Sequence, residues 1–140
     1  MSVKGEPKWL TRPIVEAIHD VQLANYGGLT GLRDASARES ALGRPMHRWH
    51  YGEAIDLADC AAAYGFGIAK NHPFADANKR TALDAMATFL ELNGQALTES
   101  EADMVHTMVG VADGSISEKR LAQWLRDNTA TPRRKRKGAR

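Results

Sequence analysis

The side chains best suited to chemistry gather in one short segment, residues 71–81, which reads NHPFADANKRT. Within it, His72 has the one type of side chain whose unperturbed pKa, about 6.5, lets it accept a proton near neutral pH, so it is a candidate general base. Lys79 and Arg80 follow where a helix is predicted to begin. Cations there are unfavourable by about 0.3–1 kcal/mol each, because the helix dipole already makes that end positive. The placement brings no local stability and instead suits a site that holds phosphate.

The remaining side chains of this segment complete the prediction of a phosphate site. Asn78 adds an uncharged amide donor, and Phe74 is predicted to point inward and anchor the segment. Asp76 lies between the base and the cations, where bound phosphate would repel it unless a hard cation such as Mg²⁺ bridged the two. Transfer of a phosphoryl or nucleotidyl group needs positioning, charge neutralisation and a base, and the segment contains all three. The alternatives are that Asp76 only caps a helix and that the cations are solvated surface charges.

Helices before and after residues 71–81 must hold this segment in position. The spacing of apolar residues, together with Ser, Thr, Gly and Pro at the boundaries, predicts six of them: one between Thr11 and Gly27, then 36–42, 53–71, 78–92, one from Ser100 and one after Ser117. Residues 44–52 show no helical stripe and are interpreted as a surface loop or short hairpin. We therefore expect an all-α fold, a compact six-helix bundle with a flap over 44–52. Residues 1–8 are predicted to be flexible, 9–128 to form the domain, and 129–140 to be a disordered basic tail.

The charge of the chain is unevenly distributed. Its 19 basic and 17 acidic residues give a net charge of +2, but residues 133–140 supply six of the basic ones. The remainder has 13 basic and 17 acidic residues, a net charge of −4. The tail either binds RNA or acidic surfaces, or is a solvating extension without a partner. A single cysteine, no signal-like N-terminus and no run of about 18 apolar residues together predict a cytoplasmic protein without a membrane segment.

Residues 72–80, HPFADANKR, resemble the signature of the Fic/Doc superfamily, whose active-site loop follows the pattern H-x-F-x-D/E-G/A-N-x-R. Lys79, and Ala77 where most Fic enzymes have glycine, match the Doc (death-on-curing) toxin branch. The likeness continues through YGGL at residues 26–29 and GSIS at 114–117, and it covers nearly all of residues 9–128. The resemblance implies the helical fold of this superfamily.

The resemblance also implies an activity. Doc toxins are components of toxin–antitoxin systems that transfer the γ-phosphate of ATP to a threonine hydroxyl of elongation factor Tu and so stop translation. By this resemblance His72 deprotonates the target hydroxyl, Asp76 takes part in coordinating Mg²⁺ and phosphate, and Lys70 joins Asn78, Lys79 and Arg80 in holding phosphates. Ordinary helix capping is the alternative for Lys70. The segment 44–51 matches the family's target-docking flap, with its side chains Arg44, Arg48, Trp49 and Tyr51; a simple connector is the alternative.

Two departures from the wider Fic pattern bear on the reaction and its control. Fic enzymes that transfer AMP usually carry a second arginine three positions after the first, and Leu83 stands there, which favours kinase activity over AMP transfer. The inhibitory motif of self-inhibited Fic proteins is missing, since its nearest candidate, Ser2 to Glu6, is followed by Pro7. Restraint is therefore expected from a separate Phd-like antitoxin. After kinase activity and AMP transfer, the third hypothesis for the function is a non-catalytic module that binds nucleic acid through its basic tail.

Overall fold

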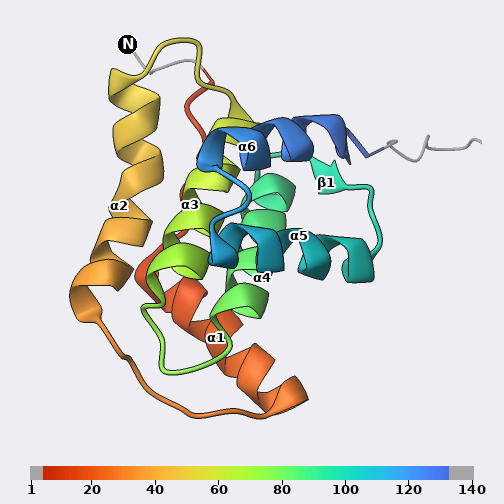
Figure 1. The fold of residues 1–140 in the computed structure, drawn as a ribbon. Coiled ribbons are helices and arrows are strands. Elements are labelled where there is room, and N and C mark those ends of the chain that lie inside the picture. The colour runs from red at the N-terminus through yellow and green to blue at the C-terminus, as the bar shows by residue number, and fades with distance from the viewer. Residues whose placement is uncertain (1–4, 133–140) are drawn as a thin grey trace, which may run out of the picture.

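A computed structural model describes residues 5–132 and confirms the mostly helical fold (Figure 1). Six helices and two short strands make up the described chain. In order they are α1 (Arg12–Tyr26), α2 (Ala35–Tyr51), α3 (Leu57–Asn71), α4 (Asn78–Leu92), β1 (Ala96–Leu97), α5 (Glu101–Asp113), α6 (Glu118–Asp127) and β2 (Thr129–Ala130). The strands pair antiparallel, with Ala96 opposite Ala130.

Helix α3 lies in the middle of the molecule, with α2, α4 and α6 packed around it (Figure 1). Its sequence explains this position, because alanine, glycine and cysteine fill most of its length and let the neighbouring helices approach closely. Cys60 and Ala61 are fully buried, and a side chain at Gly65 would collide with Met86 of α4. The two helices on either side of the predicted phosphate site are therefore tightly packed against each other.

The predicted loop or hairpin over residues 44–52 is wrong, because α2 continues through Gly43 and Pro45 to Tyr51. A proline inside a helix removes one backbone hydrogen bond and normally bends or ends the helix. Here tertiary contacts outweigh that cost. Arg48 pairs with Glu118 of α6 at 2.7 Å, and Trp49 meets the edge of Trp9 with ring centroids 6.5 Å apart.

The ends of the domain also extend beyond the predicted boundaries. Lys8, in the segment predicted to be flexible, donates its N–H to Asn93 Oδ1 at 2.8 Å, and its carbonyl accepts from Asn93 Nδ2 at 3.0 Å. Strand β2 lies within the segment predicted to be disordered. The basic residues of the predicted tail, 133–140, lie outside the described residues. Within residues 5–132, no helix has the length and apolar character needed to cross a membrane.

Candidate active site

The loop between α3 and α4 begins and ends in left-handed backbone. His72 closes α3 with φ 49°, and Ala77 precedes α4 with φ 64°. This conformation brings Cβ close to the following carbonyl oxygen and costs roughly 1–2 kcal/mol for a residue other than glycine. Contacts elsewhere must therefore hold the loop in place.

The chain that connects α1 to α2 supplies many of these contacts. It runs below the loop at the bottom of Figure 1. The carbonyl of Pro73 accepts hydrogen bonds from the backbone N–H groups of Arg33 at 2.7 Å and Asp34 at 3.0 Å, and Ala75 donates to the carbonyl of Gly31 at 3.0 Å. The two segments thus lie side by side as a short antiparallel bridge.

Asn78, predicted to donate to phosphate, is engaged with the loop itself. Its buried side chain accepts the N–H of Phe74 on Oδ1 at 3.0 Å and donates from Nδ2 to the carbonyl of Phe74 at 2.9 Å. One side chain therefore satisfies both polar backbone groups of a buried residue. This geometry makes Asn78 a brace that joins the middle of the loop to the first turn of α4.

His19 of α1 also holds the loop, and the sequence did not predict this role. Its buried ring stacks on Phe74, with centroids 4.0 Å apart and planes 11° apart, and its Nε2 lies 3.0 Å from the carbonyl oxygen of Asp76. The sequence does contain a pattern that points to His19, because Val15, His19 and Gln22 follow helical spacing and lie on one buried face of α1. A histidine on such a face needs a partner.

A cavity of about 420 Å³ opens over the loop and brings most of the predicted site residues together. It is lined by Tyr26, Gly27, His72 and the run from Ala75 to Arg80, so His72, Asp76, Asn78, Lys79 and Arg80 all border it. Phe74 is buried in the core, as predicted for the anchor of the loop, and does not line this cavity.

Five predicted side chains do not line this cavity. A Cβ on Gly114 would be 3.2 Å from the Nζ of Lys70, so this cation lies at the C-terminal end of α5, where it is favourable. Arg44 and Arg48 both pair with Glu118. Trp49 packs on Trp9, and Tyr51 is 78% exposed.

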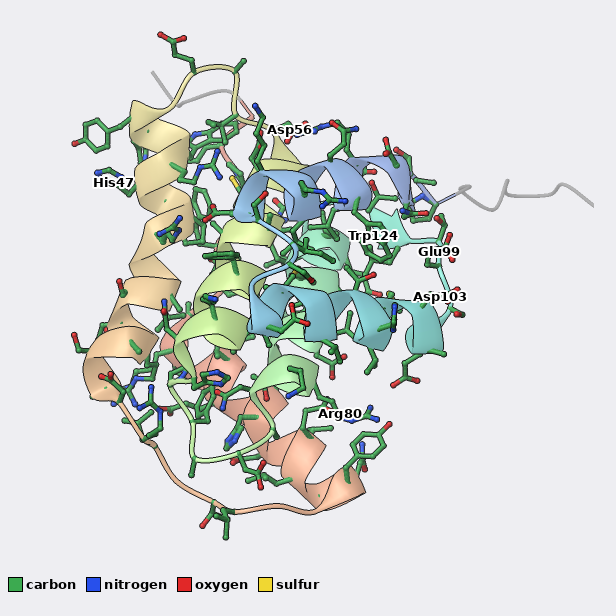
Figure 2. The ribbon with its side chains drawn as sticks, in the orientation of Figure 1. His47, Asp56, Arg80, Glu99, Asp103 and Trp124 are labelled. Carbon is green, nitrogen blue, oxygen red and sulfur yellow. The ribbon has the colours of Figure 1, made fainter. Side chains whose placement is uncertain are left out.

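The predicted flap is far from the cavity. Figure 2 shows His47, on the same helix as Arg44 and Tyr51, near the upper left of the molecule, whereas Arg80 lies at the lower side where α4 begins. The segment 44–51 is a helix that supports α6 and is not a hairpin beside the cavity. The chain between α1 and α2 occupies the place beside the active loop instead.

The electrostatics of the cavity suit proton transfer beside a bound anion. Partial burial, and after it the charges of Arg33, Lys79 and Lys70, lower the pKa of His72 below its ordinary value, so the imidazole is neutral at neutral pH. Hydrogen bonds from the N–H groups of Leu29 at 3.1 Å and Ala77 at 3.0 Å lower the pKa of Asp76, which is therefore ionised. A neutral base, a carboxylate and two cations face one space.

Arg80 is held between two neighbours at the edge of this cavity. Its guanidinium lies over the ring of Tyr26, 3.8 Å from the centroid, and forms an ion pair of 3.5 Å with Glu101. A second cavity of about 440 Å³ starts here and is lined by Tyr26, Arg80, Glu101, Ala102 and Val105. The two cavities share Tyr26 and Arg80, so a ligand larger than a phosphate group has room to extend from one into the other.

The donor set fits a magnesium ion held together with a ligand. Among the described residues, no three His, Cys, Asp or Glu side chains gather closely enough to hold a metal ion by themselves. Mg²⁺ is usually bound by one or two carboxylates together with phosphate oxygens and water, so a single ionised carboxylate beside a phosphate site is sufficient. Asp76 is that carboxylate.

The fold and the site define a helical class of protein, in which a loop with a histidine at one end and cations at the other joins two packed helices. Comparison with known families places the chain within it. The model of the Fic/DOC family matches residues 9–90.

Two named relatives agree with that match. The chain is 40% identical over 110 residues to "Protein kinase doc" of Escherichia phage P1, covering 79% of this chain and 86% of the relative. It is 40% identical over 73 residues to "Toxin Doc" of Mycolicibacterium smegmatis (strain ATCC 700084 / mc(2)155), covering 51% of this chain and 56% of the relative. The chain belongs to the Fic/Doc family.

Proposed function

We propose that this protein is a Doc-like toxin of a toxin–antitoxin system and that it acts as a protein kinase, transferring the γ-phosphate of ATP to a hydroxyl group of a target protein. One observation carries the proposal: a histidine of lowered pKa and the cationic start of a helix line the same cavity. The names of its relatives support it, since one is a protein kinase and the other a toxin.

In this reaction His72 is the general base. Its neutral imidazole accepts the proton of the target hydroxyl while the hydroxyl oxygen attacks the γ-phosphorus. The bond between that oxygen and phosphorus forms, the bond from phosphorus to the bridging oxygen breaks, and ADP leaves. The lowered pKa of His72 keeps the imidazole able to accept the proton at neutral pH.

The start of α4 holds the phosphates. Backbone N–H groups of the first helical turn have no partner within the helix, and the residues of that turn, Asn78, Lys79 and Arg80, line the cavity. Asp76 is the residue that would hold Mg²⁺ against the phosphates, and Mg²⁺ when bound would neutralise charge that builds up on them. Asn78 keeps this arrangement in register through Phe74.

The target and the partner follow from the family resemblance. We propose that the acceptor is a threonine of elongation factor Tu, that the modification inhibits translation in the cytoplasm, and that a Phd-like antitoxin restrains the enzyme. Lys70 has no part in this proposal, because it does not line the cavity. Expression of the chain alone should arrest growth, and co-expression of a Phd-like protein encoded next to it should restore growth.

The direct test is transfer of label to purified elongation factor Tu from ATP labelled at the γ-position. We expect label on the factor with the wild-type chain and none with His72→Ala, while a matched change of an exposed histidine outside the cavity, His106→Ala, should leave transfer intact. Absence of γ-label on the factor at any ATP or Mg²⁺ concentration refutes the proposed reaction.

Label from the α-position distinguishes the alternative, transfer of AMP. The position that holds a second arginine in AMP-transferring relatives is Leu83 here, and it is buried in the core at 4% exposed. We therefore expect no α-label on the target. Deleting residues 132–140 should leave the transfer intact, whereas loss of toxicity with that deletion and unchanged toxicity in His72→Ala would favour the nucleic-acid-binding alternative.

A further inference from the structure

Arg33, in the connection between α1 and α2, reaches across to the end of α3. Its Nε donates to the carbonyl of His72 at 2.6 Å, and its Nη2 donates to the carbonyl of Asn71 at 2.6 Å. The backbone N–H of the same residue donates to the carbonyl of Pro73 at 2.7 Å. One residue therefore holds three consecutive carbonyl groups at the point where the helix ends and the active loop begins.

These carbonyl groups need such a partner. The last carbonyls of a helix have no partner within it, and they form the negative end of its dipole, so a cation there is favourable. Hydrogen bonds from a charged guanidinium are also stronger than those from a neutral donor. His72 adds a further demand, because it takes the left-handed position, φ 49°, that glycine usually occupies after a helix.

The direction of the imidazole depends on that backbone turn. His72 takes the left-handed conformation where the chain leaves α3, and in this conformation it lines the cavity. Arg33 itself does not line the cavity. Among the described residues, its guanidinium donates hydrogen bonds to the carbonyls of His72 and Asn71. Its action on a bound ligand is therefore indirect, through His72.

We propose that Arg33 is a positioning residue for His72: its guanidinium fixes the carbonyls of Asn71 and His72 and thereby holds the imidazole in place for proton transfer. This inference rests on the proposed function, because kcat can be measured only if the protein transfers phosphate. It extends that proposal by naming a residue outside the signature loop on which the base depends.

The charge of Arg33 also acts on the imidazole. Three charges lower the pKa of His72 after the effect of burial: Arg33 from the α1–α2 connection, Lys79 from α4 and Lys70 from α3. Asp76 of the active loop and Arg80 of α4 border the same cavity as His72. Arg33 comes first among the three charges that lower the pKa. Removing it should raise the pKa of His72 and shift the acidic limb of the rate profile to higher pH.

The experiment compares Arg33→Met, which removes both donors and charge, with Arg33→Lys, which keeps the charge but loses the forked geometry. Arg12→Met is the matched control, because Arg12 is an exposed arginine of α1 whose ion pairs with Glu16 and Glu39 span 3.5 and 3.9 Å. For each variant we would measure kcat and the KM for ATP, urea unfolding, and the NMR titration and backbone chemical shifts of His72.

We expect Arg33→Met to lower kcat between about tenfold and 100-fold, as expected for a misplaced catalytic group, while the KM for ATP stays within about twofold. The pKa of His72 should rise, and its backbone shifts should move away from left-handed values. Arg33→Lys should show a nearly unchanged pKa and an intermediate kcat. Arg12→Met should match the wild type in every measurement.

Two results would overturn the inference. One is an unchanged kcat in Arg33→Met, with or without a raised KM. The other is a decrease in the kcat of Arg33→Lys that is fully explained by the smaller fraction of folded protein found in urea unfolding. If Arg33→Met does not fold, the backbone shifts and kcat of Arg33→Lys decide alone. If the wild type transfers no phosphate, the proposed function fails, whereas the NMR titration and shifts of His72 still confirm or refute its dependence on Arg33.

Discussion

Asn78 offers the sharpest test of how the active loop is built, because its two candidate roles predict opposite results. As a brace, it satisfies the N–H and the carbonyl of Phe74 at 3.0 and 2.9 Å in a buried setting. As a phosphate ligand, it would affect nucleotide binding and leave the folded protein as stable as before. Replacing Asn78 with alanine separates the two.

The expected loss of stability follows from the groups left behind. Asn78→Ala leaves one buried donor and one buried acceptor of Phe74 without partners, and each such group costs about 1–3 kcal/mol. Water entering from the neighbouring cavity would satisfy part of this, so we expect the free energy of unfolding to fall by about 3 kcal/mol. For a domain of this size the melting temperature should fall by roughly 10 °C.

Urea unfolding followed by tryptophan fluorescence measures this loss, with calorimetric titration of ATP as the second readout. Asn25→Ala is the control, because Asn25 is an exposed residue of α1, and we expect its effect to stay within about 0.5 kcal/mol. A loss below about 0.5 kcal/mol in Asn78→Ala, together with weaker ATP binding, would refute the bracing role and restore the phosphate role predicted from the sequence.

Asn78→Asp refines the test through its pH dependence. A carboxylate would still accept from Phe74 N–H but would face the Phe74 carbonyl with a negative charge, whereas a protonated carboxyl group donates to that carbonyl. The folded state would then hold its proton more tightly than the unfolded state, so the stability relative to wild type should decrease as pH rises from about 4 to 7. A deficit independent of pH would contradict the assignment of the Nδ2 donor to Phe74.

Three further changes probe the same scaffold. His19→Phe keeps a ring stacked on Phe74 but removes the hydrogen bond to the carbonyl of Asp76, so urea unfolding should show a loss of about 1 kcal/mol. Ala77→Gly relieves a left-handed residue, φ 64°, at the expense of a more flexible unfolded chain, and thermal unfolding should show a net gain of about 0.5 kcal/mol. The Arg126 guanidinium, 2.7 Å from Asp56, lowers the pKa of that carboxyl from 3.8 to about 2, so this pair stabilises the fold above pH 4 and loses its effect as pH falls through about 2. Because both side chains are over a third exposed, Arg126→Met should cost only about 1 kcal/mol at pH 7, and this cost should disappear as pH falls through about 2, as measured by urea unfolding across pH.

The helices that the sequence predicted best are those whose ends carry local signals. Helix α4 runs from Asn78 to Leu92 as predicted, and the hydroxyls of Ser100 and Ser117 accept N–H groups three residues further on, as N-cap residues do. The predicted end of α2 was wrong because Gly43 and Pro45 normally end a helix, and here packing against other helices overrides these local signals. The contacts of Arg48 with Glu118, which is 70 residues away in the sequence, have no local signature.

The same distinction separates the site residues that could be predicted from those that could not. His72, Asp76, Lys79 and Arg80 were accessible because they are neighbours in the sequence and their charges conflict with the helix they start. His19 and Arg33 act on backbone carbonyls 57 and 39 residues away, respectively. A carbonyl group is present at every position of the chain, so no residue type marks it as a partner. Such contacts become visible only once the fold brings the segments together.

These contacts explain how the domain keeps two cations, Lys79 and Arg80, in the first turn of α4, where the helix dipole makes positive charge unfavourable. The polar groups that brace the loop are aimed at its backbone: Asn78 at Phe74, His19 at the carbonyl of Asp76, and Arg33 at the end of α3. Because these residues satisfy the backbone of the loop, the side chains of Lys79 and Arg80 are not needed to hold it. Lys79 is exposed at the start of α4, and the unfavourable energy of its charge there becomes favourable when an anion binds. Because different residues brace the loop and carry the positive charge, the site can stay folded while its cations have no phosphate bound.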